Sequence, residues 1–160
     1  MTARLSDAYF DRIYTESADP WRPQSRWDEQ RKHAITLALL PYARYRHAFE
    51  PGCSIGVLTE RLAQRCDHVT ATDVAVAALD AAQRRLMRAG QRNAVTLLRA
   101  SLDQPWPANR YDLVVLSEVC YTSTPACCVR RWTAKCRSSR PAQPCWQRTG
   151  ATRSSLLDDR

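Results

Sequence analysis

The stretch His47-Ala48-Phe49-Glu50-Pro51-Gly52-Cys53-Ser54-Ile55-Gly56 decides the fold of this chain. A short apolar run ends in an acid, Glu50, and the glycines Gly52 and Gly56 follow directly before an amphipathic segment. This order is typical of a strand, a tight glycine turn and a helix. The glycines let the backbone approach a ligand, which the free N–H groups of the new helix then face. Alone, the pattern also fits an ordinary turn, so its meaning depends on the surrounding segments.

The rest of the chain alternates helical and strand patterns. Helices are expected over residues 5–15 after an N-cap at Ser6, from Ser25 to before Pro41 with a capping box from Ser25 to Asp28, over residues 56–66, and over residues 74–89 before Gly90. Further strands are expected at residues 68–73, 95–98 and 111–117, the last apolar on both faces and therefore buried. Strands that alternate with helices predict an α/β fold with a parallel, Rossmann-like sheet.

Four chain segments lie just beyond the predicted strand ends: Glu50–Gly56, Asp73, Ser101 and Ser117–Glu118. Ligands of parallel sheets bind beyond the carboxyl ends of the strands, so these segments are expected to meet at one site. A dinucleotide site requires Gly-x-Gly-x-x-Gly, which the spacing of Gly52 and Gly56 does not supply. The sequence therefore favours a nucleotide-type ligand of another class.

The acid-x-Gly-x-x-x-Gly spacing, followed by Asp73, resembles the class I S-adenosylmethionine-dependent methyltransferases, which often carry glycine where Ser54 stands here. Over about residues 5–121 the chain further resembles the nodulation protein S family of N-methyltransferases. The segments that carry this resemblance are Tyr9-Phe10-Asp11, Asp19-Pro20-Trp21, Ser25-Arg26-Trp27-Asp28-Glu29-Gln30-Arg31-Lys32, Glu50 to Gly56 and Leu116-Ser117-Glu118-Val119. The resemblance implies S-adenosyl-L-methionine as cofactor and a small amine or amino sugar as methyl acceptor.

The resemblance also implies roles for individual residues. The cofactor-binding set is Gly52, Cys53, Ser54 and Gly56 at the methionine part, Asp73 at the ribose, Ser101 and Leu102 at the adenine, Trp21 and Arg31 closing over the site, and also Glu50, Val74 and Ser117. The acceptor would meet Glu118 and Tyr121, with Glu118 as the candidate base. Structural alternatives stay open: Asp73 as a helix cap, Arg31 as a solvated charge, Trp21 and Cys53 as packing residues, and Glu118 as a helix-start acid.

Charge and composition limit the other function classes. The chain has 160 residues and a net charge of +8. Residues 121–160 hold eight Arg or Lys against two Asp, or +6, which leaves +2 for residues 1–120. Nucleic acid is therefore expected to bind only non-specifically, through the basic tail. Histidine and cysteine spacings predict no metal site, no apolar run predicts a membrane span, and the absence of a signal-peptide pattern favours the cytoplasm.

The pattern breaks after Tyr121. Residues 122–160 are rich in Arg, Ser, Cys and Pro and show no helical or strand period. We interpret them as the product of a changed reading frame or a truncated gene, with a disordered basic tail as the alternative. On the first interpretation residues 1–121 form an incomplete methyltransferase domain, and we expect the chain to bind cofactor but to transfer methyl groups poorly.

Overall fold

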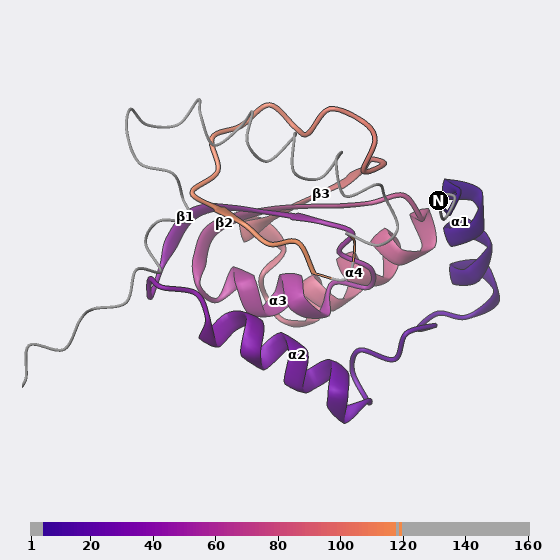
Figure 1. Ribbon diagram of the computed structural model, residues 1–160, viewed down its shortest axis with the longest axis horizontal. Coiled ribbons are helices and arrows are strands. Elements are labelled where there is room, and N and C mark those ends of the chain that lie inside the picture. The colour runs from indigo at the N-terminus through magenta and orange to yellow at the C-terminus, as the bar shows by residue number, and fades with distance from the viewer. Residues whose placement is uncertain (1–4, 118, 120–160) are drawn as a thin grey trace, which may run out of the picture.

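A four-stranded parallel sheet organises the protein, and the computed structural model describes residues 5–117 and residue 119 (Figure 1). The elements in chain order are α1 (Asp7–Glu16), α2 (Trp27–Ala38), β1 (Tyr45–Pro51), α3 (Val57–Ala63), β2 (Cys66–Asp73), α4 (Val76–Arg88), the short 3-10 helix η1 (Arg92–Ala94), β3 (Val95–Arg99) and β4 (Leu113–Val114). The strand order is β3-β2-β1-β4, with every pair parallel. The predicted Rossmann-like α/β fold is confirmed.

One face of the sheet is buried under α3 and α4 (Figure 1). Because side chains alternate along a strand, Ala48 of β1 and Val69 and Ala71 of β2 point to this face together. They form the main core with aliphatic side chains of the helices, chiefly Leu58, Leu62 and Leu86. The small alanines let the helices lie close to the strands.

Polar and aromatic side chains occupy the opposite face of the sheet, which the segment between β3 and β4 crosses (Figure 1). His47 Nε2 lies 2.8 Å from the hydroxyl of Thr70. The ring of Phe49 stacks on Tyr111 at 5.1 Å between centroids and contacts Trp106 at 4.9 Å. These aromatic contacts hold the long connection to β4 against the sheet.

The N-terminal helix follows its sequence prediction. The Ser6 hydroxyl accepts the N–H of Tyr9 at 3.2 Å, so Ser6 caps α1 as expected. The helix lies against α4, and Tyr14 joins a second small core with Ile55, Val57 and Ala78. Through this contact the N-terminal segment reaches the turn between β1 and α3.

The start of α2 differs from its prediction. The helix begins at Trp27 after Arg26, and no side chain caps it, so the capping box from Ser25 to Asp28 is wrong. The Asp28 carboxylate is instead bound by the Arg26 guanidinium at 2.7 Å. An ion pair two residues away has therefore replaced the reciprocal bond to the Ser25 backbone.

The fourth strand is shorter and less buried than predicted. Only Leu113 and Val114 form a ladder with β1, and both are half-buried, because β4 is the edge strand of the described sheet. The carboxylate of Asp112 accepts the N–H groups of Arg46 and His47 at 2.9 and 2.8 Å. The Asp112 N–H also donates to the His47 carbonyl at 3.1 Å, so both the side chain and the backbone of Asp112 hold the start of β1.

Some predictions fall outside the described residues. Glu118, Tyr121 and the segment 122–160 are among them, so the domain boundary at residue 121 stays a prediction. In the part of the chain that the structure describes, no helix is long and apolar enough to cross a membrane.

Candidate cofactor site

The turn between β1 and α3 requires its glycines. Gly52 and Gly56 have φ of +72° and +76°, in the left-handed region. A Cβ on Gly52 would lie 2.3 Å from Val119 Cγ1, and one on Gly56 would lie 2.9 Å from Ala82 Cβ. Ser54 also takes a left-handed φ, +52°, where an L residue is strained. The turn is therefore both crowded and held by its surroundings.

Asp73 fixes this turn from the end of β2. Its Oδ2 accepts the N–H of Ser54 at 2.8 Å, and its Oδ1 accepts the N–H of Ala75 at 3.0 Å. The side chain is only 8% exposed, and burial raises its pKa, while the two N–H groups act in the opposite direction. One oxygen thus serves the turn before α4, whose N-cap is Ala75, and the other serves the glycine turn. A carboxylate retains further lone pairs for a ligand's hydroxyl groups.

A chain of hydrogen bonds connects the N-terminal segment to the same turn. Trp21 Nε1 donates to the Tyr14 hydroxyl at 3.1 Å, and Tyr14 donates to Ser54 Oγ at 2.5 Å. Burial, with a further effect of Asp73, raises the pKa of Tyr14, so its hydroxyl keeps its proton. The exposed ring of Trp21 therefore stays at the edge of the site, in contact with its wall.

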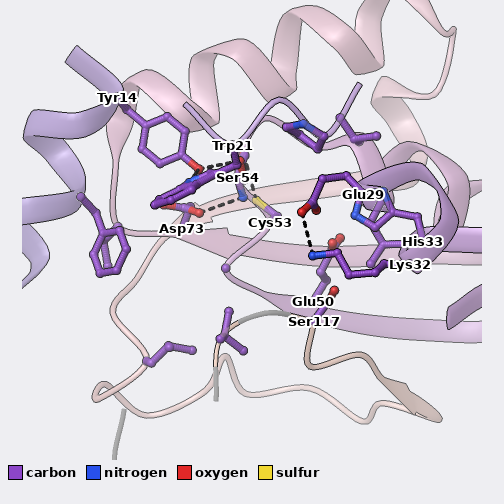
Figure 2. A pocket seen from close by; sticks show the side chains of 18 of the residues that line it. Tyr14, Trp21, Glu29, Lys32, His33, Glu50, Cys53, Ser54, Asp73 and Ser117 are labelled. Atoms are coloured by element: carbon purple, nitrogen blue, oxygen red, sulfur yellow. Dashed lines mark hydrogen bonds and ion pairs between the residues drawn. The ribbon is translucent and has the colours of Figure 1, made fainter. Parts of the chain in front are cut away.

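These residues surround one cavity of about 310 Å³ (Figure 2). The chain that follows each of the four strands contributes to its wall: Glu50, Gly52, Cys53 and Ser54 at β1, Asp73 and Val74 at β2, Ala100 and Leu102 after β3, and Ser117 and Val119 after β4. After β3 the wall is formed by the two neighbours of Ser101 and not by Ser101, the residue predicted there. The N-terminal segment adds Phe10, Tyr14 and Trp21. The expected meeting of the strand ends at one site is thus present.

The cavity has two polar sides (Figure 2). Asp73, Ser54, Tyr14 and Trp21 lie on one side, and on the other Glu50 faces a group from α2: Glu29, Lys32 and His33. Lys32 Nζ lies 2.7 Å from Glu29 Oε1. Sequence reasoning missed this group, although a spacing of i, i+3 and i+4 already places all three residues on one helix face.

Several predicted site residues lie elsewhere. Arg31 stacks on the exposed ring of Trp27 at 5.6 Å and is not among the described residues that line the cavity, because it follows the other face of α2. Ser101 is also not among the described residues that line the cavity, and its hydroxyl lies 3.3 Å from Asp7 Oδ1. Its neighbour Leu102 does line the cavity, as predicted. Gly56 lies behind the wall, against α4. Ligand contacts of the predicted set stay predictions.

Two further predictions concern the thiol of Cys53 and possible metal ligands. Cys53 is buried, and burial raises the pKa of its thiol well above the usual value, which favours the packing interpretation over a nucleophile. Within residues 5–117 and 119 no cluster of His, Cys, Asp or Glu could hold a metal ion.

Known proteins resemble the chain in sequence and in structure. The family model described as Nodulation protein S (NodS) matches residues 11–130. Nodulation protein S of Rhizobium tropici is 33% identical over 104 residues, which are 64% of this chain and 42% of that protein. The chain therefore spans less than half the length of this relative.

Two crystal structures extend the comparison. The N-methyltransferase NodS from Bradyrhizobium japonicum WM9, in complex with S-adenosyl-L-homocysteine, matches with a TM-score of 0.70 and 26% identity over 80% of this chain and 66% of that one. A candidate methyltransferase from Pseudomonas syringae matches with a TM-score of 0.58 and 37% identity over 72% of this chain and 71% of that one.

Proposed function

The chain belongs to the nodulation protein S family, and we propose that it binds S-adenosyl-L-methionine and transfers the methyl group to the nitrogen of a small amine or amino sugar. The observation that carries the proposal is the pairing of Asp73 with the glycine turn at the wall of the cavity. The solved relative from Bradyrhizobium japonicum, with S-adenosyl-L-homocysteine bound, supports the same ligand class.

The described residues fit such a cofactor in size and in chemistry. A cavity of about 310 Å³ lies at the lower end of the range for small-molecule sites. Asp73 offers acceptor oxygens for the two ribose hydroxyls, and apolar side chains such as Val74 and Leu102 offer a surface for the adenine. Glu50, on the opposite side, offers a carboxyl group to the cationic end of the methionine part.

The protein's part in the reaction is positioning. The cofactor supplies an activated methyl group on its sulfonium, so the transfer needs an acceptor nitrogen held in line with that group and water kept away. The N-terminal segment contributes to the second need, because Tyr14 and Trp21 line the cavity and are hydrogen-bonded to the glycine turn through Ser54. An amine acceptor must also lose a proton, a role for which Glu118 stays the candidate.

Isothermal titration calorimetry with the full chain tests the cofactor class. S-adenosyl-L-homocysteine and NAD are titrated in parallel, and we expect heat of binding only with the first. Binding of NAD alone would overturn the proposal. Turnover is measured separately, as S-adenosyl-L-homocysteine released in the presence of simple amines and of a hexosamine oligosaccharide.

A matched pair of variants assigns the binding to the described cavity. Asp73→Asn should weaken S-adenosyl-L-homocysteine binding by 1–3 kcal/mol, or roughly five- to 150-fold, because a buried acceptor is lost. Asp67→Asn, on the same strand, removes an exposed carboxylate that pairs with Arg44 at 2.6 Å. The control should bind as the wild type does, and equal losses in both variants would place the ligand elsewhere.

A further inference from the structure

Glu50 is an unusual buried acid. It ends the apolar part of β1, is 3% exposed and lines the cavity. Its Oε2 atom is inaccessible to solvent and has no hydrogen-bond partner among the described residues. A charged carboxylate with one oxygen unpaired is costly at such a position, so the ligand-free protein favours the neutral acid.

The groups around Glu50 do not offset that cost. Burial is the main cause that raises its pKa to about 8; the hydroxyl of Thr59 on α3 lowers the pKa and the nearby Asp73 on β2 raises it. The buried thiol of Cys53 stands in the adjoining turn. The charged and titratable side chains that α2 brings to the same cavity are Glu29, Lys32 and His33, of which Lys32 is paired with Glu29 at 2.7 Å.

We propose that Glu50 carries a proton in the ligand-free protein and releases it when the ammonium group of an S-adenosyl amino acid enters the cavity. The O–H bond of the carboxyl group breaks and the proton passes to the solvent. The resulting carboxylate then forms an ion pair with the ammonium group. The inference rests on the proposed function and adds to it a proton that is exchanged on binding.

The size of the effect follows from the partner charge. A cation at close range lowers the pKa of a carboxyl group by about 1–3 units, so from about 8 it falls to roughly 5–7. At pH 7 each binding event would then release roughly 0.4 to 0.9 of a proton. Since the bound state holds fewer protons, affinity rises with pH, by about five- to fifty-fold between pH 6 and pH 8, and levels off above pH 8.

Calorimetry in several buffers measures the released proton directly. S-adenosyl-L-homocysteine is titrated into the full chain at pH 7 in phosphate, HEPES and Tris, whose ionisation enthalpies differ. The slope of the observed enthalpy against the buffer enthalpy gives the number of protons. We expect about 0.4 to 0.9 for the wild type and less than about 0.1 for Glu50→Gln, which should also lose the rise of affinity with pH.

A second ligand separates Glu50 from Asp73, the other buried carboxyl group of the cavity. 5′-Methylthioadenosine keeps the nucleoside and the sulfur but lacks the amino-acid part, so it should bind without proton release. Release with this ligand would assign the proton to the nucleoside side and overturn the inference. This comparison uses wild-type protein alone and holds if Glu50→Gln fails to fold.

The outcomes separate the inference from the function on which it rests. Binding of S-adenosyl-L-homocysteine with no proton release overturns the inference and leaves the proposed function in place. Absence of binding at every pH between 6 and 8 overturns the proposed function, and the inference with it.

Discussion

Replacing Gly56 by alanine should destabilise the protein for two separable reasons. The residue has φ of +76°, where an alanine costs about 1–2 kcal/mol. Its new Cβ would also lie 2.9 Å from Ala82 Cβ and 3.2 Å from Ala82 Cα, and crowding of this kind in a packed core costs about 1–3 kcal/mol. Together the two effects predict a loss of about 2–5 kcal/mol, a large part of the 5–15 kcal/mol typical of a domain.

Gly90 provides the matched control for the backbone effect. It has φ of +68° at the end of α4, but a Cβ there would have no atom within 4 Å. Gly90→Ala should therefore cost only about 1–2 kcal/mol. Urea unfolding of both variants, followed by circular dichroism, measures the free energies of unfolding. The loss of unfolding free energy should be about 1–3 kcal/mol larger for Gly56→Ala than for Gly90→Ala. This difference measures the crowding between the start of α3 and α4.

A third variant tests whether Ala82 is the source of the crowding. Ala82→Gly removes the nearer of the two contacts, so in the Gly56→Ala background it should recover part of the loss, seen as a favourable coupling in a double-mutant cycle. Equal losses for Gly56→Ala and Gly90→Ala, without coupling to Ala82, would refute the close approach of the helices.

The other predictions concern single side chains. Tyr14→Phe removes the hydroxyl between Trp21 and Ser54 and should lower the free energy of unfolding by about 1–3 kcal/mol, measured by thermal melting; an unchanged melting temperature would contradict the bond. Arg65→Lys should cost about 1–3 kcal/mol in urea unfolding, because the guanidinium donates to three backbone carbonyls, one in the last turn of α2 and two in the loop that follows; a loss below about 0.5 kcal/mol would refute this role. Glu50 should contribute to stability below pH 4.5, and this contribution of up to about 5 kcal/mol should be lost as the pH rises to about 8, because folded Glu50 holds a proton that the unfolded chain releases. The free energy of unfolding of Glu50→Gln should therefore fall less over this pH range than that of the wild type, and identical pH profiles would disprove this.

The sequence predicted the sheet well because two strong local signals agreed. The strand segments before Glu50 and Asp73 each end in an acid, and the helical spacing of Ala78, Ala82 and Leu86 marks α4 as the helix between β2 and β3. Convergence of the strand ends on one cavity followed from the topology of parallel sheets alone.

The misses arise where tertiary contacts outweigh local patterns. Asp28 pairs with Arg26 rather than closing a capping box. The ladder of β4 contains only Leu113 and Val114, and Asp112 before it binds β1 largely through its side chain. Arg31 and Lys32 are adjacent in sequence, and only the phase of α2 against the sheet decides which one reaches the cavity. A charged residue's helix face is set by packing that a single sequence does not contain.

The clamp of Asp112 on the first residues of β1 has a kinetic consequence. It joins groups 65 and 66 positions apart, and such long loops close slowly because their entropy cost precedes any gain from contact. During synthesis, β1, β2 and β3 with their helices can assemble before Asp112 leaves the ribosome. Ser117 and Val119, which line the cavity, are synthesised later still. Ligand binding should therefore appear as one of the last events of folding, after most of the circular dichroism signal of the helices has formed.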